Sequence, residues 1–452
     1  MIRQNFNADW TVEKGDGNSR MNSFLGNTQT KTVHLPYDAM IHEARTPDTK
    51  NGAQTGFYPG GEYIFQKHFT APQAWQGKPV SLVFEGVYQT ALVYLNGWLL
   101  TRNVNGYAEF TVEAGPYLKY GADNLLKVIA DNSLEPNSRW YTGSGIYRPV
   151  RLLVGNKVYL PQDTVRITTR EADEGFALLD VTAQVQSAST VTERVTLQQT
   201  ICRKGTAVLT DRQNLLLQPG ESRTVSFRYC VDSPALWSPE NPNLYTSTMQ
   251  VLEGEEELDR EETGFGIRTL SIDAAHGVRI NGQTVKLRGA CIHHDNGILG
   301  AATLPDAEER RIRQLKEAGF NAIRSSHHPA GRALLDACDR YGVLVMDELS
   351  DVWNVRKNPY DYALYFEQDW KPTIQKMVAK DYNHPSVILY CVGNEISEVG
   401  SESGAETNRR LCNTFRELDP TRYTTNALNG LMAAGYRLRE IMGDVMRKFP
   451  AQ

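Results

Sequence analysis

The chain has 452 residues, of which 22% are charged and 40% hydrophobic, a balance that excludes disorder as its main state. At roughly 150 residues per domain, this length suggests about three domains. Lys and Arg number 48 against 53 for Asp and Glu, so the formal net charge is -5, and no basic block is present that would favour nucleic acid as a partner.

The first residues and the cysteines bear on the compartment. The opening segment MIRQNFNADW lacks the apolar core of a signal peptide, and no run of about 18 apolar residues occurs that would span a membrane. The 6 cysteines are scattered without a CxxC pair, which suits neither a disulfide scaffold nor a zinc site. We therefore expect a cytoplasmic protein with reduced thiols and without a membrane partner.

Two successive stretches of the chain have the pattern of β-domains. Residues 1–159 contain short β-branched runs, such as 80–84 and 91–95, separated by turn signals including Asn-Gly pairs. Residues 160–272 are similar, with strands predicted near 165–169, 178–185, 224–229 and 245–251. Short strands with frequent turns are typical of β-sandwiches, so we predict two of them in series.

From residue 273 onward, strand and helix patterns alternate. Strands are predicted at 285–290, 321–324, 343–346, 387–392 and 422–425, and helices at 306–318, 331–341 and 370–381. Asp306 is the expected cap of the first helix, and a further amphipathic helix is expected over 431–449. Repeated β-α units with apolar strands predict a parallel sheet covered by helices, and a (β/α)8 barrel is the first candidate.

The predicted barrel is short. Residues 273–452 supply five strands of the eight that a barrel needs, over fewer residues than the about 250 of a complete one. We therefore expect a TIM barrel that is truncated after about strand five.

Polar side chains follow the first four of these strands, at the end where barrel enzymes carry catalytic groups. They are His293, His294 and Asp295 after the first strand, Arg324 and His327 after the second, Asp347 and Glu348 after the third, and Asn394 and Glu395 after the fourth. A structural core does not need such residues at four successive strand ends, so we interpret them as a site.

Two chemistries fit this set. A metal-dependent hydrolase would gather His293, His294, His327 and Asp347 around a metal ion, although adjacent histidines tend to face opposite ways. A glycosidase needs a carboxylic acid that exchanges a proton with a sugar oxygen beside an amide that holds the sugar, and the pair Asn394 and Glu395 supplies both. We favour the second chemistry.

Two long segments, NAIRSSHHPAGRALLDACDRYGVLVM at 321–346 and DYNHPSVILYCVGNE at 381–395, resemble the signatures of glycoside hydrolase family 2, which contains β-galactosidases and β-glucuronidases. FNADW, GGEYIFQKHF, VYLNGW and GSGIYRPV in the first 150 residues are similar to the family's jelly-roll sugar-binding domain. LWSPENPNLY and GFGIRTLSI resemble the end of its immunoglobulin-like domain and the lead into the barrel. The resemblance implies a jelly roll over 1–159, an immunoglobulin-like sandwich over 160–272 and a partial TIM barrel over 273–452.

The resemblance also implies roles for single residues. Glu395 matches the general acid/base, Asn394 the amide that holds the sugar 2-hydroxyl, and Arg324 the arginine that orients the nucleophile. His327 and His293 match histidines that face the sugar. Asp295 is expected to contact the sugar, whereas His294, Asp347 and Glu348 are expected either to do so or to form structural hydrogen bonds.

Some family features are not matched. An ungapped reading places Val352 and Asn354 where metal-dependent β-galactosidases have magnesium ligands, and Arg139 where their jelly-roll aspartate stands. No required cofactor is therefore expected. Some glucuronidase relatives carry a flavin, and no residue here indicates one. In the family the nucleophile follows the seventh strand, so we expect it in a C-terminal part beyond this sequence and expect the 452-residue chain alone to be inactive.

The functional prediction is a retaining exo-β-glycosidase that hydrolyses terminal β-galactosides or β-glucuronides and forms a homo-oligomer in its full-length form. The loop at 351–362 resembles that of metal-independent β-galactosidases, which favours galactosides. The alternatives are a catalytically silent carbohydrate-binding protein, because a jelly roll and a partial barrel could bind a glycan without cleaving it, and the metal-dependent barrel hydrolase.

Overall fold

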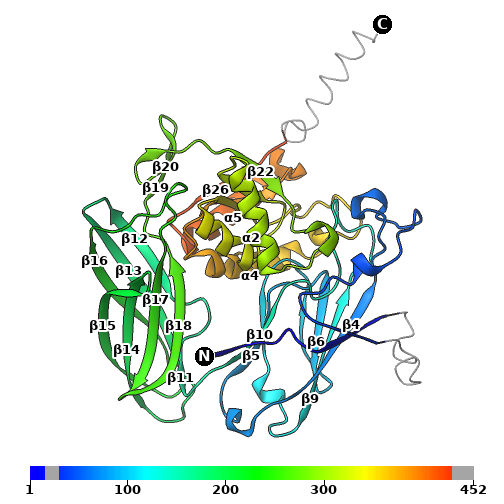
Figure 1. The fold of residues 1–452 in the computed structure, drawn as a ribbon. Coiled ribbons are helices and arrows are strands. Elements are labelled where there is room, and N and C mark those ends of the chain that lie inside the picture. Colours follow the sequence, from blue (N-terminus) through cyan, green and yellow to red (C-terminus); the bar gives the residue numbers. More distant parts are fainter. Residues whose placement is uncertain (16–29, 430–452) are drawn as a thin grey trace.

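The computed structural model describes residues 1–15 and 30–429, which form three successive units (Figure 1). In the first unit, two antiparallel sheets pack face to face. One sheet consists, in order, of β1 (Ile2–Asn5), β10 (Val150–Val154), β5 (Val80–Phe84) and β8 (Phe110–Glu113); the other consists of β3 (Lys31–Val33), β2 (Trp10–Lys14), β4 (Glu62–Thr70), β9 (Asp123–Asp131), β6 (Thr90–Leu95) and β7 (Trp98–Asn103). Alternate residues of these strands point into a shared core. We call this unit the jelly-roll domain.

The second unit is a sandwich of two four-stranded antiparallel sheets, which we call the immunoglobulin-like domain. One sheet contains β11 (Val158–Tyr159), β12 (Arg166–Ala172), β13 (Phe176–Ser187) and β16 (Ser222–Asp232); the other contains β14 (Glu193–Arg203), β15 (Thr206–Leu217), β17 (Tyr245–Glu253) and β18 (Glu256–Phe265). Val158 pairs with Ser187, so this sheet already begins two residues before the predicted domain boundary.

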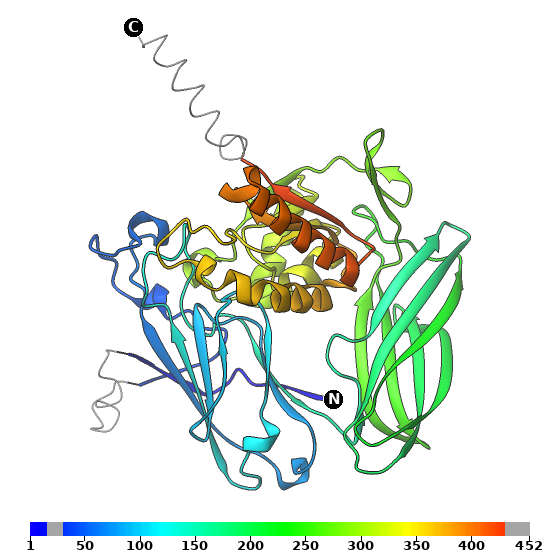
Figure 2. The same ribbon diagram turned by 180° about the vertical axis from the view of Figure 1, so that it is seen from behind.

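A small antiparallel sheet of β19 (Leu270–Asp273), β20 (Gly277–Ile280) and β21 (Gln283–Thr284) leads into the third unit. Its five strands are all parallel and lie in chain order: β22 (Gly289–Ile292), β23 (Ala322–Ser325), β24 (Leu344–Glu348), β25 (Val387–Asn394) and β26 (Tyr423–Ala427). Within the described residues this unit also contains four α-helices: α2 (Pro305–Glu317), α3 (Arg332–Tyr341), α4 (Phe366–Asp381) and α5 (Glu402–Leu418). Figure 2 shows these helices packed beside the sheet from the opposite side, and we call this unit the barrel domain.

The predicted elements of the barrel domain differ from the structure at four places, one of which is α4, which begins at Phe366, four residues before the predicted start. The strand predicted at 285–290 overlaps β22 only at its last two residues, because the preceding segment is used by the small sheet and a linker. Helix α2 has Leu304 rather than Asp306 at its N-cap, with Asp306 in its first turn. Helix α5 was not predicted, and the helix expected at 431–449 lies outside the described residues.

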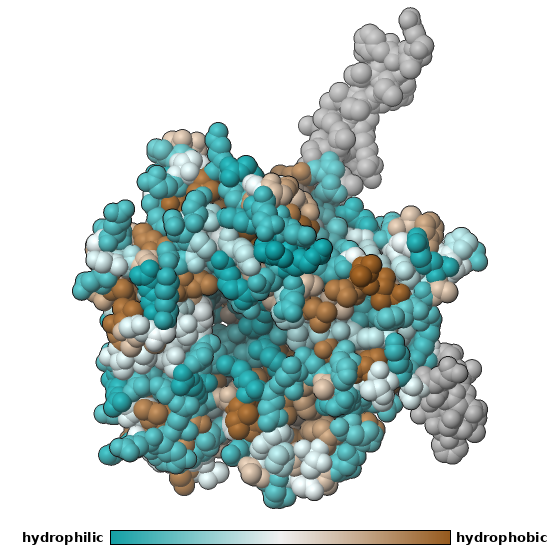
Figure 3. Space-filling model, viewed as in Figure 1, coloured by the Kyte–Doolittle hydropathy of each residue, from teal (hydrophilic) through white to brown (hydrophobic). Residues whose placement is uncertain are grey.

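The immunoglobulin-like and barrel domains meet around a polar cavity. It occupies about 330 Å³ and is lined by residues of the immunoglobulin-like and barrel domains, among them Asp163, Glu261, Arg332 and Lys380. The surface is largely hydrophilic and is hollowed between the units (Figure 3). Within the described residues, no helix is both long and apolar enough to cross a membrane.

Candidate active site

The fourth barrel strand delivers an amide and a carboxylic acid in succession. Asn394 is the last residue of β25 and is buried, whereas the side chain of Glu395 is 38% exposed. Glu395 has a φ of 45°, a left-handed conformation that few residues other than glycine adopt, and its N–H donates to the carbonyl of Ala427 in β26 at 2.7 Å. The strand therefore ends in a sharp turn that leaves Asn394 inside and Glu395 accessible.

Asn394 is fixed on both sides of its amide. Its Oδ1 accepts a hydrogen bond from Arg324 Nη2 at 2.8 Å, and its Nδ2 donates to Asp351 Oδ1 at 2.8 Å. Arg324 comes from β23 and Asp351 from the loop after β24, so three neighbouring strand ends meet at this residue. The rotamer of Asn394 is thus determined by the network around it.

Arg324 connects the second and third strands. Its Nε donates to Glu348 Oε2 at 2.7 Å, and the other oxygen of Glu348 lies 2.7 Å from Nδ1 of His327. Burial lowers the pKa of Arg324, but the charge and hydrogen bonds of fully buried Glu348 outweigh it and raise that pKa above its ordinary value. Glu348 therefore anchors Arg324 and His327 from beneath.

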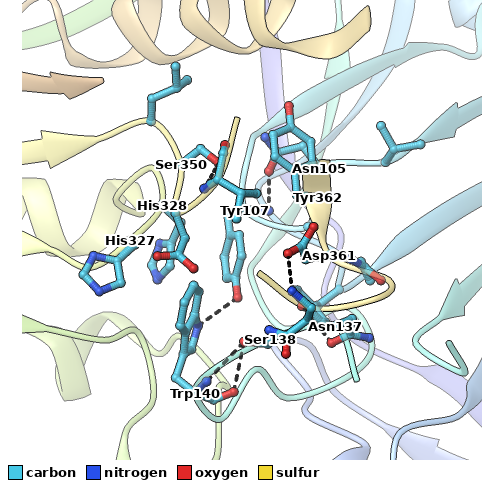
Figure 4. Close-up of a pocket in the computed structure, with 18 residues that line it drawn as sticks. Asn105, Tyr107, Asn137, Ser138, Trp140, His327, His328, Ser350, Asp361 and Tyr362 are labelled. Carbon is cyan, nitrogen blue, oxygen red and sulfur yellow. Dashed lines mark hydrogen bonds between the residues drawn. The ribbon is translucent and has the colours of Figure 1, made fainter. Parts of the chain in front are cut away.

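His293 belongs to an aromatic cluster shared by two domains. Its ring stacks on Trp140 of the jelly-roll domain, with centroids 5.1 Å apart and planes 22° apart, and meets His327 edge-on at 5.6 Å. Burial, followed by the neighbouring charge of His327, lowers the pKa of His293. Trp140 is fixed in turn by a hydrogen bond from its Nε1 to Tyr107 Oη at 3.0 Å (Figure 4).

Two predicted residues, His294 and Asp347, lie away from this network. His294 is buried against Tyr107 and Tyr147, and its Nε2 lies 2.9 Å from the carbonyl of Thr142. Burial lowers the pKa of His294 to about 3, so its ring is neutral. Both histidines follow the end of β22 and have different neighbours: His293 stacks on Trp140, whereas His294 packs against Tyr107 and Tyr147.

The alternation of side chains along β24 separates Asp347 from Glu348. Asp347 is completely buried, accepts hydrogen bonds from the N–H groups of Ala330 and Glu348 at 2.8 and 3.0 Å, and lies 3.7 Å from Lys380. Burial, and then the charge of Asp381, raises the pKa of Asp347 well above its usual range. In the structure, these contacts of Asp347 are with backbone N–H groups and Lys380, away from the network around Asn394.

The four residues of the metal alternative do not come together. Within the described residues, the only group of three side chains close enough to share a metal ion is Asp336, Asp339 and His384, beside the start of β25. The metal-dependent hydrolase therefore has no ligand set among the residues that were predicted for it. Asp295 is half-buried in the loop after β22, where its backbone carbonyl accepts a hydrogen bond from Arg311.

An ion pair that was not predicted from the sequence, between Arg139 and Asp351, joins the jelly-roll domain to the site. Asp351 accepts hydrogen bonds from Arg139 Nε and Nη2 at 3.1 and 2.6 Å, and from Lys357 Nζ at 2.9 Å. Burial raises the pKa of Asp351, but Arg139, Lys357 and Asn394 together hold it below its ordinary value. In the sequence, Arg139 stands out only because it occupies the place of the jelly-roll aspartate of the metal-dependent β-galactosidases.

A narrow pocket adjoins this network on the side of the jelly-roll domain. It is lined by two jelly-roll loops, 104–107 and 137–140, and by the barrel loops that carry His327, Asp351 and Tyr362 (Figure 4). Its volume of about 50 Å³ is room for a few water molecules rather than a sugar ring. The polar groups around it hold the two domains together next to the exposed Glu395.

Two β-sandwiches followed by a parallel β/α sheet whose fourth strand ends in an Asn-Glu pair define the architecture of the three-domain glycosidases. Three family models match the chain in this order: the glycosyl hydrolase 2 galactose-binding domain-like model at 10–176, the glycosyl hydrolases family 2 model at 158–268 and the family 2 TIM barrel domain at 274–446. The chain belongs to glycosyl hydrolase family 2.

Known relatives agree with this assignment. The chain is 37% identical over 406 residues to the β-galactosidase BoGH2A of Bacteroides ovatus, a match that covers 90% of this chain and 48% of that protein. It resembles the crystal structure of a family 2 member from Bacteroides cellulosilyticus, with a TM-score of 0.92, 35% identity, and 99% and 60% of the two chains covered. It also resembles the crystal structure of a β-glucuronidase of Bacteroides uniformis, with a TM-score of 0.82 and 27% identity; the match covers 94% of this chain and 52% of that one. The chain spans about half the length of the curated relatives it matches.

Proposed function

We propose that the whole protein is a retaining exo-β-glycosidase that removes terminal β-galactosyl or β-glucuronosyl groups, with Glu395 as general acid/base. The observation that carries this proposal is the Asn394–Glu395 pair at the end of β25, in which the amide is fixed by Arg324 and Asp351 while the carboxyl of Glu395 remains 38% exposed. A proton donor must be reachable by the glycosidic oxygen, and a fixed amide can hold a sugar hydroxyl. The names of the relatives support both sugar classes.

Retention requires a second carboxylate, the nucleophile, about 5 to 5.5 Å from the acid/base. Glu348 is buried with its oxygens bonded to Arg324 and His327, and Asp351 is bonded to Arg139, Lys357 and Asn394. Neither carboxylate is available to attack an anomeric carbon. In family 2 the nucleophile follows the seventh barrel strand, and the described residues contain five, so we infer that it lies outside residues 1–15 and 30–429.

In the proposed mechanism, Glu395 gives its proton to the glycosidic oxygen as the nucleophile attacks the anomeric carbon and the aglycone leaves as an alcohol. Glu395 then takes a proton from water, which displaces the nucleophile and restores both carboxyl groups. Asn394 binds the 2-hydroxyl, and His293, Asp295 and His327 bind other sugar hydroxyls. This chemistry uses no cofactor.

The test compares Glu395→Gln with the control Glu402→Gln, which changes an exposed carboxylate in the first turn of α5. Without a proton donor, we expect hydrolysis of alkyl β-glycosides to fall about 10²–10⁴-fold, while dinitrophenyl glycosides, whose leaving group needs no proton, lose far less. Added azide should restore turnover and give a β-glycosyl azide. An equal loss on both substrates would contradict the acid/base role, and binding of sugar without any cleavage by the wild type would support the carbohydrate-binding alternative.

A further inference from the structure

Arg139 is the point at which the jelly-roll domain reaches the proposed acid/base. Two nitrogens of its guanidinium donate to Asp351, and the third, Nη1, lies 3.6 Å from Oε2 of Glu395. One planar cation from the first domain therefore faces two carboxylates of the third domain. The side chain of Arg139 is 33% exposed, so it lies at the rim of the site.

The position of this guanidinium is set by Asp351. Lys357 Nζ and Asn394 Nδ2 donate to Oδ1 of the same carboxylate at 2.9 and 2.8 Å, and Lys357 also donates to the backbone carbonyl of Asn394 at 2.7 Å. Because a guanidinium is planar and its two bonds to a carboxylate fix its orientation, the place of Nη1 follows from the place of Asp351. Asp351 in turn is tied to the residue directly before Glu395.

As a general acid, Glu395 needs a neighbouring group that fixes the position of its carboxyl. Its carboxyl stands on a flexible, partly exposed side chain, whereas a general acid acts only when it is within hydrogen-bond reach of the glycosidic oxygen. Within residues 1–15 and 30–429, its carboxyl contacts Arg139 and Asn429, whose Nδ2 lies 3.3 Å from Oε1. The bidentate bond to largely buried Asp351 gives Arg139 a structural role, but the partly exposed contact between Nη1 and Glu395 adds little to stability.

We propose that Arg139 is a positioning residue for Glu395. Its bonds to Asp351 hold it still, and its free edge attracts the Glu395 carboxylate toward the jelly-roll side of the site. The acid/base of the barrel domain thus depends on correct docking of the jelly-roll domain. This inference rests on the proposed function, since it assigns Arg139 a role through Glu395.

The first experiment measures kcat/KM of Arg139→Met, Arg139→Lys and Arg102→Met on methyl and dinitrophenyl β-glycosides, in whichever of the galactoside and glucuronide series the wild type cleaves. Arg102 is the matched control, because it also extends from the jelly-roll domain to the barrel domain, where its Nη2 lies 3.5 Å from Tyr365 Oη. We expect Arg139→Met to lose at least about tenfold more on the methyl glycoside than on the dinitrophenyl glycoside, because only the former needs a placed proton donor. Arg139→Lys should recover part of the difference, and Arg102→Met should show none. An equal loss on both substrates would overturn the proposal.

The second experiment does not depend on turnover, so it separates this inference from the proposed function. Crystal structures of the wild type and of Arg139→Met are compared at the Glu395 side chain. We expect the carboxyl to leave its place beside residue 139 or to become spread over several rotamers, with Asn394 unmoved. A Glu395 carboxyl that keeps one position in the variant would overturn the proposal even if the wild type cleaves glycosides, whereas an inactive wild type with a displaced carboxyl in the variant would count against the proposed function alone.

Discussion

The two β-sandwiches contact the barrel domain at opposite ends and in different ways. The jelly-roll domain meets the carboxyl ends of the strands with side chains that enter the site, Arg139 and Trp140. The immunoglobulin-like domain and its linker meet the opposite end through hydrogen bonds to backbone carbonyls: Trp237 Nε1 donates to Asp339 O at 2.9 Å, and Arg268 donates to Pro385 O and Val387 O at 2.6 and 2.8 Å. If Glu395 is the acid/base, as proposed, we expect the first contact to affect catalysis and the second to affect stability alone.

Arg332 links all three units, and its replacement is expected to have the largest effect on stability. Arg332, at the start of α3, donates to Glu109 of the jelly-roll domain at 2.8 Å and to Asp163, which precedes β12. Burial raises the pKa values of Glu109 and Asp163, but the charge of Arg332 outweighs it and both lie below their ordinary values. Arg332→Met removes this charge and should lower the free energy of unfolding at pH 7 by about 3 kcal/mol, because two buried carboxylates lose a partner.

The pH dependence of this loss has a definite sign. Carboxylates whose pKa values are lowered by folding stabilise the protein above their unfolded values, near 4, and this contribution is lost as the pH falls below them. The difference between wild type and Arg332→Met should therefore shrink below about pH 4, as urea unfolding at several pH values would show. Arg340→Met, which removes a half-exposed partner of Glu309, is the control. A difference that stays constant with pH would mean that packing, not charge, explains the loss.

The immunoglobulin-like contact should affect stability without affecting chemistry. Trp237 is fully buried, and Trp237→Phe removes the hydrogen bond to Asp339 O while retaining an aromatic ring. We expect a loss of about 1–3 kcal/mol in unfolding free energy, with an unchanged ratio of rates on methyl and dinitrophenyl glycosides. The control Trp98→Phe changes a ring that is 65% exposed and should have almost no effect. A changed substrate ratio in Trp237→Phe would show that the two ends of the barrel are coupled.

The sequence predicts features that depend on local patterns, but not those that depend on how the domains dock. Strands β23 to β26 and the residues at their ends were found because apolar runs followed by polar residues are local patterns. A sequence motif names adjacent residues together, whereas the pleat of β24 brings Glu348 and not Asp347 to Arg324. His293 and His294 are separated by the backbone that follows the end of β22. Arg139 and Asp351 were not predicted together, since they are 212 residues apart and only domain docking joins them. Helix α5 was missed because its polar first turns hide the apolar face that contains Leu411 and Phe415.

His294 and His384, at the two ends of the barrel domain, allow a direct comparison of the two interfaces, with the smallest expected effects on stability. At the carboxyl end, burial lowers the pKa of His294 to about 3. At the opposite end, His384 Nδ1 lies 2.6 Å from Asp339 Oδ2; burial lowers the pKa of His384, but the charge of Asp339 outweighs it and raises the pKa above its ordinary value. Folding therefore favours the neutral form of the first ring and the protonated form of the second, so a change in pH should alter the stability contributions of the two rings in opposite directions.

The expected slopes follow from linkage between protonation and folding. Unfolding lets His294 bind a proton with a pKa near 6.5, so its contribution to stability is present above that pH and is lost as the pH falls, by up to about 1.4 kcal/mol per pH unit. His384 contributes fully below about pH 6.5, and that contribution is lost as the pH rises through its folded value. Unfolding free energies measured from pH 5 to 8 should therefore show a shallower acid decline for His294→Asn and a shallower alkaline decline for His384→Gln, each relative to wild type. If both variants flattened the same limb, the two ends would share one electrostatic environment and the contrast between the two interfaces would be wrong.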